Sequence, residues 1–188
     1  MITIKPVVML LALIYTGFLF GQSSQISEFD SLLDEITLRD AKLKIIEFPA
    51  EKVRLQTEIT ELYGKILPIS PQPVSFVMRY YLLTEYGRLA WFLLLDNQPQ
   101  KSAEISEKLL PQTSCDYDLD WVTVNLALAL LNQGALEKAN TIIRTRKDSI
   151  LHDGRAWRTV FFNDVDTLTK AGVWHQDMGK VEGLFKDK

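Results

Sequence analysis

Residues 120–146, DWVTVNLALALLNQGALEKANTIIRTR, decide the fold. The second half of this stretch places apolar residues such as Ala139 and Ile143 at helical spacing, with polar residues on the other face. The first half, residues 121–131, is apolar nearly all round, which is typical of a helix covered on more than one side. Gly134 separates the halves and can adopt a positive φ without a Cβ penalty. The stretch therefore predicts two helices folded back on each other.

A weaker copy of this pattern lies upstream, in residues 88–110, RLAWFLLLDNQPQKSAEISEKLL. The Asn-Gln pairs at 97–98 and 132–133 are 35 residues apart, and Ala103 and Ala139 are 36 apart. Two helical hairpins at such a spacing indicate a helical repeat.

Residues 126–139, LALALLNQGALEKA, resemble the tetratricopeptide repeat (TPR), whose period is about 34 residues. That family has a small residue where two helices cross, a Gly at the turn and an Ala in the second helix. Pro99 stands near the upstream turn, where the family prefers Gly, so the repeat is degenerate. The residues that the resemblance assigns to repeat packing are Leu89, Ala90, Ala103, Ala127, Gly134 and Ala139.

The resemblance, which covers residues 74–146, also implies a binding surface. TPR hairpins stack into a right-handed superhelix, and the first helix of each hairpin lines a concave groove for peptides or proteins. By position, the groove residues here are Thr84, Trp91, Trp121, Val124, Leu128 and Asn132. The family members that grip a peptide carboxylate use Lys, Asn and Arg on this helix, whereas this chain has Val124 and Leu128. We therefore expect an apolar groove that holds a peptide or a partner helix.

The N-terminus resembles a secretory signal peptide. Lys5 precedes an apolar run at residues 6–20, and the small residue Gly21 precedes a polar stretch. We expect cleavage near Gly21 and export to the periplasm or the exterior. The alternative is an uncleaved membrane anchor formed by residues 6–20, although this run is shorter than the ~18–20 residues of a typical spanning helix.

Residues 22–72 are expected to form an N-terminal helical hairpin. The first helix covers residues 23–48, and its apolar stripe shifts at Leu38 and Ile45, which leaves a bend or break near residues 39–40 open. Pro49 suits the first turn of the second helix, which is expected to run to about Leu67. Three prolines in residues 68–73 predict a loop.

The remaining chain divides into the TPR-like repeats, residues 73–150, and C-terminal capping helices, residues 151–188. The repeats begin with an aromatic-rich helix over residues 74–95, and Gly172 marks the end of a helix over residues 156–171. The predicted fold is all-α, with residues 22–188 as one domain. Antiparallel helical hairpins stack as a short TPR-like right-handed solenoid with a C-terminal capping helix.

Composition and motifs predict no catalytic, metal or cofactor site. The formal net charge is −3, and removal of residues 1–21 with Lys5 would make it −4, which argues against nucleic-acid binding. Cys115 is the only cysteine, so no internal disulfide can form. The two histidines lack metallopeptidase spacing, and no nucleophile elbow or phosphate-binding loop occurs. Asp116, Asp118 and Asp120 are most simply a turn rich in capping residues.

The sequence thus predicts an exported, non-enzymatic scaffold or accessory subunit that binds another protein or peptide, with self-association also open. Two alternatives remain. A lipid or apolar-ligand carrier would show a closed cavity among its aromatic side chains, Tyr80, Tyr81, Trp91 and Trp121. An enzyme with a carboxylate site would show carboxyl groups of raised pKa in one pocket.

Overall fold

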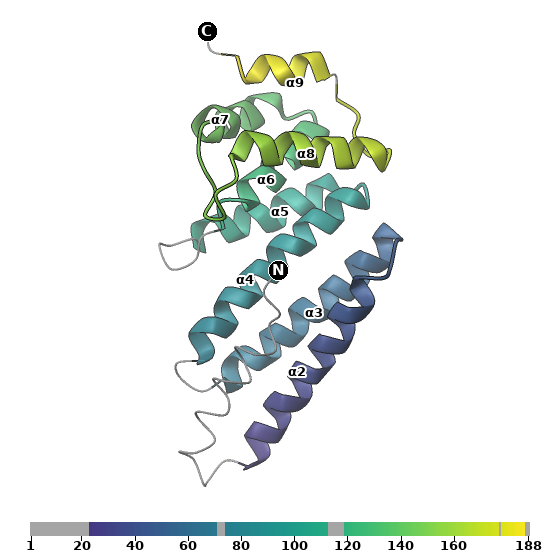
Figure 1. Ribbon diagram of the computed structural model, residues 1–188, viewed down its shortest axis with the longest axis vertical. Coiled ribbons are helices and arrows are strands. Elements are labelled where there is room, and N and C mark those ends of the chain that lie inside the picture. The colour runs from purple at the N-terminus through teal and green to yellow at the C-terminus, as the bar shows by residue number, and fades with distance from the viewer. Residues whose placement is uncertain (1–22, 71–73, 113–118, 177, 187–188) are drawn as a thin grey trace.

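The computed structural model describes residues 23–70, 74–112, 119–176 and 178–186. The expected signal peptide, Cys115, Asp116 and Asp118 lie outside the described residues. The described residues form eight α-helices, which confirms the all-α fold (Figure 1). The helices are α2 (Ser23–Leu43), α3 (Pro49–Ile69), α4 (Val74–Leu95), α5 (Pro99–Leu109), α6 (Val122–Asn132), α7 (Leu136–Arg146), α8 (Trp157–Lys170) and α9 (Met178–Leu184). A 3₁₀ turn, Leu110–Gln112, follows α5.

Each helix from α2 to α6 packs against the helix that follows it in the chain. Contacts also join α4 to α6, α6 to α8 and α7 to α9. In Figure 1, α4 lies between the α2–α3 hairpin and the helices from α5 onward. The helices therefore pack sequentially, as adjacent pairs.

Four helices, α4, α5, α7 and α8, contact α6. This explains its composition, because a helix covered on all sides can bury apolar residues all round. Every residue from Val122 to Leu131 is buried. The sequence-based expectation that this helix is covered on more than one side is confirmed.

The interior has two main apolar clusters. One contains buried residues of α2, α3 and the first turns of α4. The other contains the end of α4, one residue of α5, and residues of α6 to α9. Because α4 contributes to both clusters, it joins the N-terminal hairpin to the rest of the chain.

The helices α4 and α6 meet closely at Gly87. A Cβ added at Gly87 would lie 2.8 Å from Cζ2 of Trp121 and closer still to its Cη2. Nearby, Asn125 Nδ2 donates a buried hydrogen bond to the Gly87 carbonyl oxygen at 3.1 Å. Because Gly87 has no side chain, there is room for the Trp121 ring. The Gly87 carbonyl oxygen also accepts a hydrogen bond from the buried Asn125 amide.

The N-terminal hairpin differs from expectation in two places. The α2 helix ends at Leu43 rather than at residue 48, and it is continuous through residues 39–40, where a bend or break had been left open. Its buried residues Phe29, Ile36 and Leu43 recur every seven positions. Leu38 therefore lies on a second face of α2, whereas Ile45 lies in the turn beyond the end of the helix. The α3 helix also extends to Ile69 with Pro68 inside its last turn.

The predicted glycine turns are confirmed at both positions. Gly134 has φ +75° between α6 and α7, and Gly172 has φ +73° after α8. At the C-terminal end, Trp157 of α8 is fully buried, and its Nε1 donates to Thr123 Oγ1 of α6 at 2.7 Å. Across the described ranges, no helix is both long and apolar enough to cross a bilayer.

We predict that Gly87→Ala destabilises the protein by about 1–2 kcal/mol. The added methyl group collides with the Trp121 ring, and such overpacking costs more than the ~1 kcal/mol that alanine gains in a helix. The measurement is urea unfolding followed by circular dichroism.

Gly64→Ala in α3 is the matched control, because nothing lies within 4 Å of its added Cβ. We expect this variant to be up to about 1 kcal/mol more stable than the wild type. Equal stabilisation by both substitutions would contradict the tight contact between α4 and α6.

Candidate functional site

The six residues predicted to line the groove fall into two groups that differ in burial. Val124 and Leu128 have exposed fractions of 0%, because α6 is covered by its four neighbouring helices. Neither side chain presents a surface to a partner. The expected groove therefore has no open floor at these two positions.

The other four predicted groove residues are half-buried. Thr84 Oγ1 donates to the Tyr80 carbonyl at 2.9 Å, as threonine commonly does within a helix. The Trp91 and Trp121 rings pack against the larger apolar cluster. Asn132 Oδ1 is buried, and none of the described residues donates a hydrogen bond to it. Of these four, Trp91 and Trp121 therefore contribute to the core.

The residues predicted to pack the repeats lie at buried positions, apart from the turn glycine. Leu89, Ala90, Ala103, Ala127 and Ala139 are all buried. Small residues at helix contacts are common to helical bundles in general. Their burial therefore fits stacked hairpins but does not by itself distinguish TPR geometry.

Large apolar side chains are exposed instead around the turn between α2 and α3. Ile45 and Phe48 have exposed fractions of 79% and 74%, and Leu38, two turns before Ile45, is 57% exposed. Clustered exposed apolar residues on a soluble protein commonly mark an interaction site. We call Leu38, Ile45 and Phe48 the α2–α3 patch and treat it as the candidate functional site.

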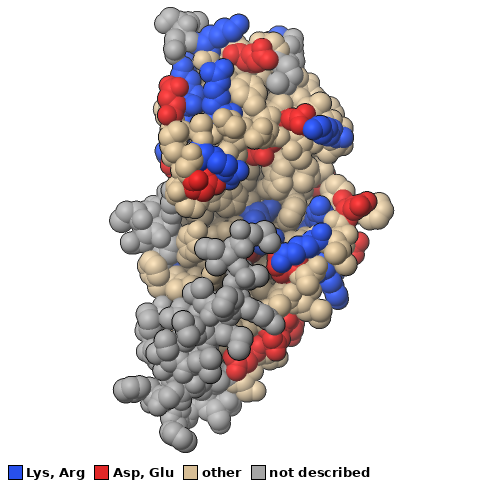
Figure 2. All heavy atoms as spheres, viewed as in Figure 1, with Lys and Arg blue, Asp and Glu red and all other residues tan. Residues whose placement is uncertain are grey.

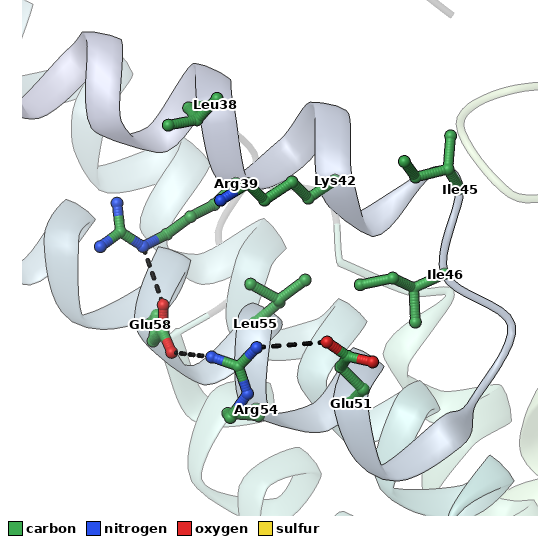
Figure 3. A pocket seen from close by; sticks show the side chains of 9 residues that line it. All are labelled: Leu38, Arg39, Lys42, Ile45, Ile46, Glu51, Arg54, Leu55 and Glu58. Carbon is green, nitrogen blue, oxygen red and sulfur yellow. Dashed lines mark hydrogen bonds and ion pairs between the residues drawn. The ribbon is translucent and has the colours of Figure 1, made fainter.

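A pocket of about 310 Å³ opens beside this patch, between the end of α2 and the start of α3 (Figure 3). Its lining combines apolar and charged side chains from both helices. The lining residues are Leu38, Arg39, Lys42, Ile45, Ile46, Glu51, Arg54, Leu55 and Glu58. Leu55 is buried and Ile46 half-buried, so the apolar part of the lining continues into the hairpin core.

The charged side of the pocket is a chain of ion pairs, drawn as dashed lines in Figure 3. Glu58 contacts Arg39 Nε at 2.9 Å and Arg54 Nη1 at 2.5 Å, and Arg54 Nη2 lies 3.4 Å from Glu51. The hydrogen bond from Arg39, aided by Arg54, lowers the pKa of Glu58. The carboxylate therefore stays ionised at neutral pH and is already paired. Lys42 has no ion-pair partner among the described residues.

A buried polar network fixes the hairpin that carries this pocket. Gln56 Nε2 of α3 donates to Glu85 Oε2 of α4 at 2.6 Å. Arg88 Nη1 contacts the same carboxylate at 3.0 Å, and its Nη2 lies 3.3 Å from Asp40 Oδ1 of α2. Burial raises the pKa of Glu85, although Arg88 and Gln56 oppose the shift. The network joins three helices and sets how the hairpin sits on α4.

Two described carboxyl groups have a raised pKa, as the alternative of a carboxylate enzyme site requires. Burial raises the pKa of Glu85 on α4 and raises the pKa of Asp164 on α8 to about 6. These two carboxyl groups lie on different helices, and neither lines the α2–α3 pocket. Among the described residues, no group of three potential metal ligands occurs.

The aromatic residues considered for an apolar-ligand cavity belong to separate apolar clusters. Tyr81 packs in the N-terminal cluster, where its ring centroid lies 6.1 Å from that of Tyr63. Trp91 and Trp121 pack against the other cluster. These side chains therefore stabilise separate parts of the core.

Sequence reasoning missed the α2–α3 patch because it assigned Leu38 and Ile45 to a buried stripe. A signal for the patch was present. Phe29, Ile36 and Leu43 already supply one apolar face for α2, so the further apolar residues Leu38 and Ile45 exceed what the hairpin can bury. On the face shown in Figure 2, charged residues of both signs are interspersed with other side chains.

We predict that Glu85→Gln weakens the pH dependence of stability. Because burial raises the pKa of Glu85 in the folded state, this group stabilises the fold at pH values below its ordinary pKa of 4.5. The contribution is lost as the pH rises through the folded-state pKa. Glutamine stays neutral, so the stability of the variant relative to the wild type should increase from pH 4 upward. Denaturant unfolding at a series of pH values measures this difference. The control, Glu104→Gln at an exposed site on α5, should follow the wild type, and parallel curves for both variants would contradict the prediction.

Comparison with known proteins finds no match to the chain among protein-family models, curated proteins or solved structures.

Proposed function

We propose that this chain is a non-enzymatic protein–protein interaction module, a scaffold or accessory subunit built from TPR-like helical hairpins. The sequential packing of neighbouring helices supports this proposal, as do the contacts between α4 and α6 and between α6 and α8. Stacked hairpins make such contacts between helices two apart in the chain. In this arrangement, α8 and α9 cover the end of the stack.

The observation that carries the proposal is the α2–α3 patch beside its pocket. Exposed large apolar side chains weaken the solubility of a free protein, so they commonly belong to surfaces that a partner covers. Ile45 and Phe48 remain exposed, whereas Phe29, Ile36 and Leu43 are buried in the hairpin core. The binding surface is therefore proposed at the α2–α3 end, in place of a groove floored by Val124 and Leu128.

The proposed location is the periplasm or the exterior of the cell, as the signal-like residues 1–21 suggest. A module of this kind would assemble with another exported or envelope protein. An enzyme or lipid carrier is the weaker proposal, because the raised-pKa carboxyl groups are dispersed and the aromatic side chains belong to separate clusters.

The proposal predicts position-specific cross-linking to a protein partner. A photoreactive phenylalanine derivative is placed in the full chain at the position of Ile45 or Phe48, and the producing cells are irradiated. We expect a discrete covalent adduct with one protein, identified by mass spectrometry, because the partner covers these side chains.

The matched control is the same derivative at Ile150, another apolar residue with an exposed fraction of 61%. This position should yield no such adduct. The absence of adducts at Ile45 and Phe48, or the same adducts at all three positions, would overturn the proposed interaction role.

A further inference from the structure

The last helix, α9, and the residues that follow it cover aromatic side chains of α8. Val181 of α9 and Phe185, just beyond its end, are buried, with exposed fractions of 1% and 4%. The Phe185 ring centroid lies 6.3, 5.1 and 4.9 Å from those of three aromatic residues of α8, Trp157, Phe161 and Phe162. We call residues 178–186 the C-terminal strap and these three aromatic residues its seat.

The polar contacts that hold the strap in place are weak. Lys147 Nζ, just after α7, donates to the Phe185 carbonyl oxygen at 3.5 Å, which is the long limit for a hydrogen bond. The guanidinium carbon of Arg158, an exposed residue, lies 5.3 Å from the Phe185 ring centroid. Cation–π contacts at exposed positions contribute little. The strap is therefore held mainly by the burial of Val181, Leu184 and Phe185.

The strap follows α8 on a longer connection than the other hairpins have. The α8 helix ends at Gly172 with the same pair of backbone hydrogen bonds, and the same positive φ, that end α6 at Gly134. Residues 171–177 then separate α8 from α9, whereas residues 133–135 separate α6 from α7. The longer tether lets α9 leave its seat without unwinding α8.

The strap is also a weak helix. The α9 helix has seven residues, whereas α5 and α7 have 11 each. It contains Gly179 and Gly183, whereas α5 and α7 contain no glycine. Glycine is a poor helix former, and isolated helices shorter than about 12 residues are marginal in water. Packing does not require Gly183, because a Cβ added there would meet nothing within 4 Å. The seat, rather than its own sequence, therefore stabilises α9.

We propose that the C-terminal strap is a releasable cover, which opens as a unit while the rest of the fold stays intact. Opening exposes the aromatic seat on α8, and closing buries it again. In Figure 1, α9 lies at the far end of the molecule from α2. The device is therefore separate from the α2–α3 patch and from the function proposed for it.

Hydrogen exchange of the full chain, followed by mass spectrometry, measures this opening. We expect the strap amides to exchange about a hundredfold or more faster than those of α6, relative to their intrinsic rates. Gly183→Ala should slow exchange of the strap roughly three- to tenfold, because alanine favours the closed helix.

Gly64→Ala in α3 is the matched control, because it adds a methyl group to a helix that the strap does not contact. It should slow exchange of α6, which requires unfolding of the whole chain, and leave exchange of the strap unchanged. Local opening does not depend on the stability of α3.

A labelled peptide of residues 173–188 tests whether the seat becomes vacant. Phe185→Asp in the full chain removes the largest buried side chain of the strap, so the open state should predominate. We expect the peptide to bind this variant about tenfold or more tightly than the wild type, whose own strap competes for the seat. A peptide that carries the same substitution should bind neither chain.

Three results would overturn the proposal. If Gly64→Ala slows exchange of the strap as much as that of α6, the strap opens only when the whole fold unfolds. If Phe185→Asp abolishes protection of the α6 amides, the strap is an inseparable part of the core. If the wild-type peptide binds the Phe185→Asp chain no better than the wild-type chain, the seat is not vacated.

Discussion

The close contact between α4 and α6 at Gly87 is the constraint on which the arrangement of the chain depends. At this position the Trp121 ring occupies space that a side chain would fill, and Asn125 pairs with the Gly87 carbonyl group. Ridge-and-groove packing alone leaves two helices some freedom to slide. A ring seated on a glycine and a buried hydrogen bond remove that freedom. Because α4 also contributes to the N-terminal cluster, this contact places the α2–α3 hairpin relative to the C-terminal helices.

Polar groups fix the N-terminal hairpin in a different way. Apolar side chains tolerate many rotations about a helix axis, whereas hydrogen bonds to a buried carboxylate require particular distances and angles. Glu85 has a raised pKa from burial, so its stabilisation depends on Gln56 and Arg88 keeping their positions. Arg88 extends this requirement to Asp40 of α2. The orientation of the pocket on the molecule thus follows from a few polar side chains.

Helix positions were largely predictable because each depends on local signals. Periodicity and Pro49 predicted the start of α3, the apolar run predicted that α6 is covered on more than one side, and glycines predicted the turns at Gly134 and Gly172. The extension of α3 through Pro68 to Ile69 was missed, because proline usually breaks a helix and three prolines in residues 68–73 indicated a loop.

The candidate site was harder to predict, because exposure depends on which helices cover each face. The sequence pattern at Val124 and Leu128 is the same whether these residues line a groove or are buried. Only the packing of four helices around α6 shows that they are buried. Leu38 and Ile45 present the reverse case, since their helical spacing suggests burial but no described helix covers them. Gly87 was also missed, because its role depends on a tryptophan 34 positions later in the chain.

The exposed α2–α3 patch also bears on how the protein is maintained in a cell. Stacked helical hairpins generally require end elements with a polar outer face to remain soluble. At its α2 end this chain instead presents Ile45 and Phe48 to solvent. A partner bound there would serve as such an end element. Chains made in excess of that partner would keep a hydrophobic end and be more prone to aggregation and degradation. The abundance of the protein would then be set by the supply of its partner rather than by its own synthesis alone.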